Sequence, residues 1–381
     1  MNHNGAWRHK KNKLGIVPSG LLGSGGFYII KEKSKMNWSN ETKLCFEACV
    51  LIEEDILVCC AYNMNLIFTI NIITNEIKVL GSIPEEPFFK RQLIGNIQYW
   101  NGKLFFIPLT ASKIWSYTLE NQSWKSISLG KNIEENIKFK FSGAFIKEDI
   151  LYMLGYQYFG IVKINLNDRN QLTFIPGDDW ESSTNEFSCG KSFVQMENKI
   201  YMASCSNKLI VFDLLQENYE YINVGLSDER FVGVCNYKGD LWIAPLIYTS
   251  DILIYGKERI KVKKFLKKYS TYESICICGN EVLINGYTEN SIKINMDKTP
   301  YTPELVQEKI YYNNYVNNKF VIRSGYGYID VYSVAEKKWN RLTCQIKNKL
   351  FKENVKQTFD NNFMQENELD NLNLFITAVC G

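Results

Sequence analysis

Hydrophobic and polar positions follow a regular order in the stretch from Gly102 to Trp124. A polar turn precedes the apolar run 104–107, small residues precede a second apolar run at 114–119, and a further polar turn leads to Trp124, which opens a last short run. Runs of this length that are rich in β-branched and aromatic residues and bounded by Gly, Asn and Ser are typical of packed strands. The stretch therefore predicts consecutive antiparallel strands.

The same pattern recurs along the chain. When the first apolar residue after the first polar turn is taken as an anchor, seven anchors are found 38 to 50 residues apart: Ile56, Leu104, Ile150, Ile200, Leu241, Val282 and Phe320. Repeats of about this length predict one four-stranded propeller blade each. We therefore expect an all-β chain with a single β-propeller of about seven four-stranded blades, within a range of six to eight.

A second spacing supports this register. The distance from a residue near the end of the third strand to the residue that opens the fourth strand is seven positions in five copies: Ile70 to Ile77, Tyr117 to Trp124, Phe212 to Tyr219, Ile294 to Tyr301 and Tyr332 to Trp339. It is eight positions from Ile164 to Leu172 and about five from Tyr255 to Ile260. One turn length is therefore expected to be reused in most blades.

The order of these elements resembles the kelch-repeat β-propellers over about residues 46–346. Trp124 and Trp339 stand at the position of the kelch tryptophan, and a small residue followed by tyrosine, as at Tyr62 and Tyr156, replaces the kelch double glycine. The resemblance implies a propeller that acts as a protein-binding or scaffolding module through its loop face.

The chain is expected to have three parts: a flexible basic arm at 1–20, the propeller at 21–346 and a C-terminal extension at 347–381. Residues 21–45 are expected to supply outer strands that close the ring, because an untied first and last blade would leave an open interface. Apolar residues spaced as on one helix face predict a short C-terminal helix packed on the propeller. The segment 370–379 also resembles an eighth anchor, which favours a strand there.

Composition excludes some classes of protein. The chain has 381 residues, of which 45% are hydrophobic and 14% aromatic, so a disordered chain is excluded. The formal net charge of +3 gives no reason to expect a nucleic-acid or membrane partner. Eleven cysteines, an odd number with no secretion signal before them, indicate reduced thiols and a cytoplasmic protein.

Candidate catalytic chemistry is scarce. The two histidines, His3 and His9, both lie in the basic arm, so a Ser-His-Asp or Cys-His pair in the propeller would require the arm to fold inward. The cysteine spacings do not match a structural zinc site. A copper site like that of galactose oxidase, on a kelch-like propeller, needs histidine ligands. We therefore predict no catalytic residue, no metal and no cofactor, and do not favour an enzyme.

The densest basic run of the chain lies between 257 and 268. Arg259, Lys261 and Lys263 alternate, which places them on one face of an outer strand. A charged edge that prevents strand pairing between molecules is the simpler interpretation, and a docking patch for an acidic partner is the alternative.

Four tyrosines that replace the second kelch glycine are the candidate ligand-binding residues: Tyr62, Tyr156, Tyr287 and Tyr326. Equivalent positions in successive blades lie on the same face, so these rings are expected to form an arc around one mouth of the propeller. Tyrosines that wedge between blades are the alternative interpretation. Trp180, flanked by Asp178, Asp179 and Glu181, is a further candidate, since an acid pair beside an aromatic ring suits a carbohydrate; a solvated turn has the same composition.

Two functions follow from these observations. The first is a protein-binding or scaffolding module that presents its loops to a protein partner. The alternative is a carbohydrate-binding or carbohydrate-active protein with a tyrosine-lined pocket at one mouth. A nucleic-acid partner is not predicted, because the basic run lacks interleaved aromatic residues.

Overall fold

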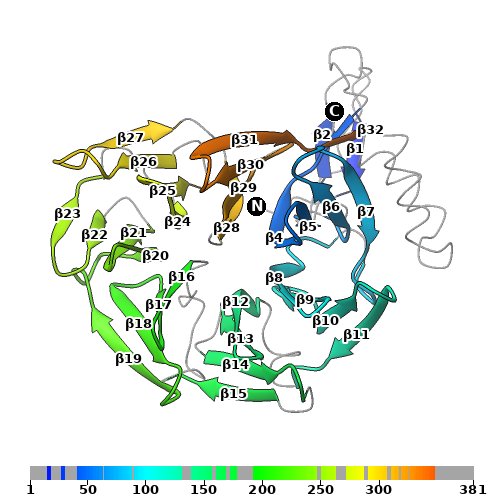
Figure 1. Cartoon of the computed structure of the whole chain (residues 1–381), viewed down its shortest axis with the longest axis horizontal. Coiled ribbons are helices and arrows are strands. Elements are labelled where there is room, and N and C mark those ends of the chain that lie inside the picture. Colours follow the sequence, from blue (N-terminus) through cyan, green and yellow to red (C-terminus); the bar gives the residue numbers. More distant parts are fainter. Residues whose placement is uncertain are drawn as a thin grey trace.

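The computed structural model describes residues 15–18, 27–30, 41–62, 64–87, 90–130, 139–156, 160–168, 172–177, 192–246, 250–262, 272–286, 291–306, 310–316, 319–325 and 327–347. Within these ranges the strands form seven four-stranded sheets arranged around one axis, as the blades of a propeller (Figure 1). This confirms the predicted all-β propeller. No helix occurs in these ranges, and the predicted C-terminal helix lies at 348–381, outside them.

Each blade takes its four strands in chain order from the axis outward. The first strands are β4 (Phe46–Ile52), β8 (Ile94–Trp100), β12 (Phe141–Lys147), β16 (Phe193–Met196), β20 (Phe231–Tyr237), β24 (Tyr272–Cys278) and β28 (Ile310–Val316). The second strands are β5 (Ile56–Ala61), β9 (Lys103–Pro108), β13 (Ile150–Gly155), β17 (Lys199–Ala203), β21 (Asp240–Pro245), β25 (Glu281–Gly286) and β29 (Phe320–Gly325).

The third and fourth strands complete the blades toward the rim. The third strands are β6 (Ile67–Asn71), β10 (Ile114–Thr118), β14 (Gly160–Asn165), β18 (Lys208–Asp213), β22 (Ile252–Ile254), β26 (Ser291–Asn295) and β30 (Tyr328–Ser333). The fourth strands are β7 (Ile77–Gly81), β11 (Ser123–Ile127), β15 (Leu172–Pro176), β19 (Asn218–Asn223), β23 (Glu258–Ile260), β27 (Pro303–Val306) and β31 (Lys338–Thr343).

Every anchor residue lies at the first or second position of the second strand in its blade. Leu57, Leu104, Leu151, Ile200, Val282 and Val321 pair with the third-strand residues Ile70, Tyr117, Ile164, Phe212, Ile294 and Tyr332. The anchors Ile56, Ile150 and Phe320 therefore precede the equivalent position by one residue. They are themselves apolar because each packs, half-buried, against a core cluster between blades.

The second spacing identifies true cross-strand partners in most blades. Ile70 pairs with Ile77, Tyr117 with Trp124, Ile164 with Leu172, Phe212 with Tyr219, and Tyr332 with Trp339.

Two of the predicted pairs are wrong. Ile294 pairs with Pro303, because Tyr301 precedes the strand and its ring packs on Trp242, 5.2 Å away between ring centroids. Ile252 pairs with Ile260, because Tyr255 lies in the turn between β22 and β23.

Residues 21–45 were expected to supply outer strands that close the ring; of these, 27–30 and 41–45 are described. Every blade is built from one continuous stretch of chain, whereas β1 (Gly15–Pro18) pairs only with β2 (Phe27–Ile30) among the described strands. β3 (Glu41–Lys43) instead pairs with β32 (Gln345–Lys347), beside the blades. Residues 41–43 and 345–347 thus form a two-stranded sheet of their own. They add no strand to the first or last blade, each of which already has four.

Two main-chain hydrogen bonds join the last blade to the residue before the first blade, and a third extends the β30–β31 ladder beside them. Leu44 N–H donates to the carbonyl of Cys344 (2.9 Å), Cys344 N–H donates to Gly327 (2.8 Å), and Gly327 N–H donates to Leu44 (2.9 Å). Leu44 and Cys344 are both fully buried, in a core cluster that also contains Phe46 of β4 and Leu342 of β31. This seam therefore has both the main-chain bonds and the apolar packing of a protein interior.

The first strands approach one another closely around the axis. A Cβ added at Gly95 of β8 would lie 2.1 Å from the carbonyl oxygen of Phe141, the first residue of β12. That distance is far below contact, and the obstacle is backbone rather than a flexible side chain. Glycine at this position is therefore required for the spacing of the second and third blades.

We predict that Gly95→Ala lowers the free energy of unfolding by about 3 kcal/mol, as expected for overpacking against backbone. Urea unfolding of the purified variant would measure this loss. Gly102→Asn is the matched control, because Gly102 has a positive φ of 72° that asparagine tolerates and has no atom near its would-be Cβ. Equal stability of the two variants would contradict the assignment.

Candidate functional site

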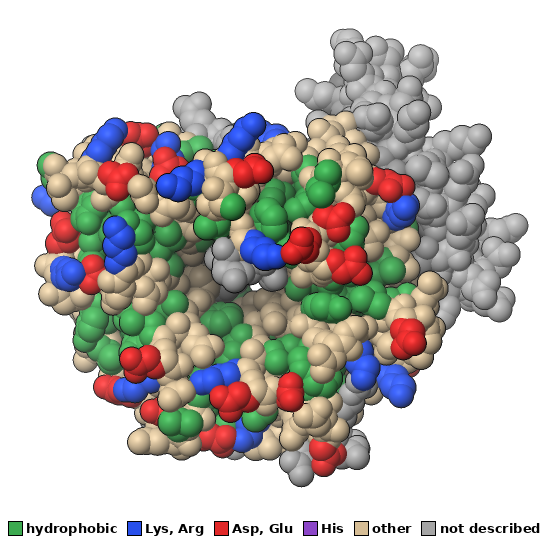
Figure 2. All heavy atoms as spheres, in the orientation of Figure 1, with side chains coloured by type: hydrophobic (Ala, Val, Ile, Leu, Met, Phe, Trp, Pro, Cys, Tyr) green, Lys and Arg blue, Asp and Glu red, His purple; other side chains and the backbone are tan. Residues whose placement is uncertain are grey.

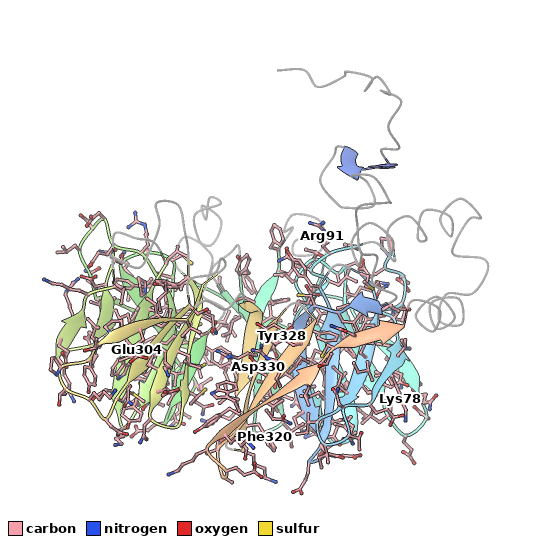
Figure 3. All side chains as sticks on the ribbon, turned by 90° about the horizontal axis from the view of Figure 1, so that it is seen from above. Lys78, Arg91, Glu304, Phe320, Tyr328 and Asp330 are labelled. Atoms are coloured by element: carbon pink, nitrogen blue, oxygen red, sulfur yellow. The ribbon has the colours of Figure 1, made fainter. Side chains whose placement is uncertain are left out.

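The ring has two unlike faces. One face carries the turns between first and second strands, and six of these turns have described residues with φ between 43° and 89°, among them Glu53, Asn101, Glu148, Glu197, Lys238 and Gly279. We call it the turn face. The opposite loop face carries the connections between blades. Figure 3 shows Arg91 at the loop face and Phe320 and Lys78 toward the turn face.

Turns on the turn face are fixed by side chains at one repeated position, the last residue of the third strand. Asn71 Oδ1 accepts the N–H groups of Ile73 (2.9 Å) and Thr74 (2.8 Å), and Asp213 Oδ1 accepts those of Leu215 (2.8 Å) and Gln216 (2.9 Å). Asn165 and Asn295 make the same type of contact. These residues are Asx-turn formers, which explains why the same turn recurs from blade to blade.

Hydrogen bonds from Gln216 and Leu215 N–H lower the pKa of the Asp213 carboxyl. A lowered pKa in the folded state contributes stability above the ordinary aspartate value of about 3.9, and this stability is lost as the pH falls through the folded value. Because asparagine offers the same acceptor without titrating, Asp213→Asn is expected to keep the neutral-pH melting temperature. Below about pH 4 the variant should lose less of its melting temperature than the wild type, which thermal melts between neutral and acid pH can check. Parallel curves for both proteins would refute this assignment.

The axis of the ring is a cavity of about 530 Å³. Figure 2 views the ring from the turn face and shows the hollow at its centre, with acidic and basic side chains interspersed around it. The described wall residues come from the first strands of six blades, or directly precede one: Ala48, Cys49, Gly95, Asn96, Gln98, Ala144, Phe145, Ile146, Ser192, Phe193, Val194, Gln195, Val234, Cys235, Asn236, Ser274, Ile275, Cys276 and Ile277. None of these described wall residues is charged. We call this space the central channel.

Amide and hydroxyl groups in the channel wall are oriented by neighbouring backbone. Gln98 Nε2 donates to Asn96 Oδ1 (2.7 Å) and to the carbonyl of Ala144 in the next blade (2.8 Å). Asn236 Oδ1 accepts Gly239 N–H at 3.0 Å, and Ser192 Oγ accepts the N–H of Val234 at 3.2 Å. Asn96 Nδ2, Gln98 Oε1 and Asn236 Nδ2 make no further hydrogen bond within the described residues. The channel therefore presents fixed, neutral donors and acceptors.

Aromatic residues of the channel wall have covered ring faces. Phe145 stacks on Tyr152 with ring centroids 5.0 Å apart and an interplanar angle of 9°. Its ring also packs against Phe193 at 5.4 Å. Both phenyl rings therefore pack within the seam between the third and fourth blades.

Thiols also occur in the wall. Cys49 is half-buried and pairs across β4 and β5 with Cys59, which is fully buried, and burial raises the pKa of the Cys59 thiol well above its ordinary value. None of the nine cysteines in the described ranges is in a disulfide. A reagent that enters the channel can therefore reach Cys49 but not its cross-strand partner.

We predict that iodoacetamide alkylates Cys49 in the native protein well before Cys59, because only Cys49 is accessible and because alkylation requires a thiolate. Peptide mapping by mass spectrometry after a time course would measure both rates. Urea-unfolded protein is the control in which the two rates should converge. Simultaneous labelling under native conditions would argue against an open channel.

Of the predicted site residues, Tyr62 and Tyr156 are described and both are half-buried. Both residues make main-chain hydrogen bonds at the end of the second strand. Tyr62 N–H donates to the carbonyl of Cys45 (2.8 Å), and its own carbonyl accepts Gln92 N–H (2.9 Å). Tyr156 N–H donates to the carbonyl of Lys140 (2.8 Å). Leu109 and Leu246 make the equivalent main-chain bond in other blades, so this role does not need tyrosine.

Neither Tyr62 nor Tyr156 is among the residues that line the central channel. The ring of Tyr156 packs edge-on against Phe139, 6.1 Å away between centroids. Tyr287, Tyr326 and Trp180 lie outside the described residues. The tyrosine arc therefore stays a prediction. The amides of the channel wall were not singled out from the sequence, since isolated Asn and Gln in strands carry no spacing signal.

Several charged groups are already paired. Asp330 is buried and accepts Arg341 Nε at 2.7 Å, Arg341 Nη2 at 2.9 Å and Arg323 Nη2 at 3.0 Å. The guanidinium of Arg323 lies 4.3 Å from the Trp339 ring centroid and that of Arg341 4.0 Å from the centroid of Tyr328. Tyr328 and Asp330 are labelled in Figure 3. The network holds the three outer strands of the last blade together, and its carboxylate is not placed to act as an acid or base.

The basic run is also partly paired where it is described. Arg259 Nη1 contacts Glu229 Oε1 at 2.6 Å, and Lys257 Nζ contacts Asp240 Oδ2 at 2.7 Å. Lys261 is exposed and follows the end of β23, so it does not lie on the strand with Arg259, and Lys263 and the rest of the run beyond it lie outside the described residues. These pairs favour a structural role for the described part of the run, at the edge strand β23.

No group of three or more His, Cys, Asp or Glu side chains in the described part of the chain is arranged to hold a metal ion. The acidic cluster at 53–55 is engaged in other contacts: Asp55 Oδ2 accepts Asn71 Nδ2 at 2.7 Å, and the Lys319 ammonium, 2.8 Å from Glu54, lowers the pKa of the Glu54 carboxyl. As far as the chain is described, no helix has the length and apolar character of a membrane span.

No protein-family model matches the sequence, and neither does any curated protein. Solved structures with a similar fold include virginiamycin B lyase from Staphylococcus aureus, with a TM-score of 0.55 and 10% identity over 75% of this chain and 94% of that one. YCF48 from Cyanidioschyzon merolae has a TM-score of 0.56 and 8% identity over 77% and 97%. A chain of the Mitotic Checkpoint Complex has a TM-score of 0.54 and 7% identity over 82% and 95%. At such identities the similarities show the propeller fold alone.

Proposed function

We propose that the protein is a binding module that recognises a protein partner with its loop face. The observation that carries this proposal is the difference between the two faces. The described turns on the turn face are two to seven residues long, and most contain a residue with positive φ. The connections between blades, at 82–93, 128–140, 177–192, 224–230, 261–271 and 307–309, are mostly longer and differ more widely in length. Varied loops on a rigid scaffold are a common arrangement for recognition surfaces.

Described residues of these connections expose the chemistry of a protein interface. Leu226, in the connection before β20, is 64% exposed, and Arg91, in the connection before β8, is also exposed. Lys113 and Glu85 form an ion pair (2.7 Å) on the same face, which joins the first two blades. An exposed leucine, an exposed arginine and an ion pair on one face suit a protein surface better than a small polar ligand, because interfaces combine apolar contacts with a charged rim.

The similar structures add general support for a protein partner. One YCF48 structure is described as bound to D1 peptide, and another similar chain belongs to the Mitotic Checkpoint Complex. The kelch resemblance favours the same class of function. Virginiamycin B lyase shows that this fold also serves catalysis, and its inactive form carries a histidine-to-alanine change. In this chain both histidines, His3 and His9, lie outside the described residues, so we do not propose that activity.

We predict that the double variant Arg91→Glu and Leu226→Asp weakens binding of the protein partner at least tenfold, because it reverses a charge and places a carboxylate on an apolar contact. The partner would be isolated from native lysate by affinity capture, purified and titrated calorimetrically.

A matched double variant on the opposite side, Lys78→Glu and Leu215→Asp, is the control. Leu215 is 75% exposed, on the turn face, so both pairs change equally accessible residues. Equal loss of affinity in the two double variants would contradict the loop face as the binding surface. A sugar that raises the melting temperature, with the effect lost in Tyr156→Ala, would favour the carbohydrate alternative.

A further inference from the structure

We propose that the central channel binds an extended, uncharged peptide segment. This inference rests on the proposed function, since it assigns to the partner a segment that enters the ring. The channel is a space of about 530 Å³ that combines a wall of strands with polar groups that have remaining hydrogen-bonding capacity within the described residues.

The electrostatics of the wall favour a neutral occupant. The described wall contains six polar uncharged residues and three cysteines, and no Asp, Glu, Lys or Arg. A charged side chain that entered this space would lose water without gaining an opposite charge, which is costly. At the turn face the Lys319 ammonium is paired with Glu54, and the Lys147 ammonium donates to the neutral amide oxygen of Asn198 at 2.8 Å.

The polar groups of the wall suit peptide units. Each peptide unit offers one N–H donor and one carbonyl acceptor, and each must be paired when it is removed from water. Gln98 offers its carbonyl oxygen, whereas Asn96 and Asn236 offer N–H donors from the second and fifth blades. Gln195 uses its amide nitrogen on the carbonyl of Glu197 (3.2 Å), which leaves its oxygen as an acceptor. Donors and acceptors on opposite sides of the ring can thus pair with both edges of an extended chain.

The dimensions also agree. A volume of about 530 Å³ lies within the usual range of ligand sites, roughly 300–1,000 Å³. The first strands that line the channel, such as β8, have seven residues, which corresponds to about 23 Å at the rise of a strand. A peptide of six or seven extended residues spans the same length. Apolar wall residues, such as Ile146 and Ile277, then provide contacts for its side chains.

A sugar fits this wall less well. Carbohydrate rings bind by stacking on exposed aromatic faces, as well as by hydrogen bonds. The aromatic residues of the described wall, Phe145 and Phe193, pack against each other, and Phe145 also stacks on Tyr152. A sugar in the channel would have the amides, but one face of the Phe145 ring is already occupied by Tyr152.

The test uses a phage-displayed random heptapeptide library panned against the full chain. Selected sequences would be synthesised with acetyl and amide caps, labelled with fluorescein and titrated by fluorescence polarisation. We expect peptides without Asp, Glu, Lys or Arg in their central positions. Their affinity should fall at least tenfold for the double variant Gln195→Glu and Asn236→Asp, which adds two negative charges to the wall. Asn236→Asp keeps the oxygen that accepts Gly239 N–H, so the strand end is preserved.

Gln216→Glu is the matched control, an equally conservative change on an exposed turn away from the channel. Peptides that bind wild type and the channel variant equally would overturn the proposal, and so would an absence of enriched peptides or enrichment of charged ones. A partner whose affinity is lost in Arg91→Glu with Leu226→Asp but unchanged in the channel variant would leave the proposed function standing and refute the channel site. If neither double variant weakens binding of the partner, both the loop-face site and the channel site are refuted.

Discussion

Closure of the ring by main-chain hydrogen bonds is the constraint on which the rest of the molecule depends. Leu44 precedes the first blade and Cys344 follows the last, and the two are joined through Gly327 by three bonds of 2.8 to 2.9 Å. No strand is exchanged between the first and last described blades, and a separate two-stranded sheet of β3 and β32 joins the chain before the first blade to the chain after the last. The seam is held by burial of Leu44, Phe46, Leu342 and Cys344 in one cluster, and by Phe46 N–H on Ser324 Oγ at 3.1 Å.

This mode of closure makes the inner ring tight, and the channel follows from it. Seven first strands share one axis, so small residues such as Gly95, Gly143 and Gly233 stand where neighbouring strands approach, and a Cβ at any of them would contact the next blade. The same positions limit how far large side chains can fill the centre. A wall of strands fixed by ladder bonds on one side and by neighbouring blades on the other is rigid. Its amides therefore keep their positions whether or not a ligand is present, which reduces the entropic cost of binding.

Much of the fold was predictable because each blade obeys the same local rules. Leu104, Ile200 and Val282 were found by pattern, since a buried second strand must be apolar whatever its partners. The partner of the closing segment was not predictable, because the role of residues 41–43 depends on meeting 345–347, which only the completed ring brings together. The pairing of Ile294 with Pro303 was also missed. Tyr301 precedes the strand and packs its ring on Trp242, a contact that no local sequence pattern shows.

The candidate site was largely invisible in the sequence for a related reason. Asn96, Gln195 and Asn236 lie in different blades, and each by itself is an ordinary polar residue within an alternating strand. The tyrosines were chosen as candidates because they recur at one position of the repeat. Residues that recur in this way are often the ones that each blade uses for its own packing. A ligand in a ring of seven blades meets a different residue from each blade, so its contacts are expected at positions where the repeats disagree. The uncharged wall of the channel and the unequal connections of the loop face are both positions of that kind. On the turn face the repeats agree more closely, because the same Asx turns close the third and fourth strands of several blades.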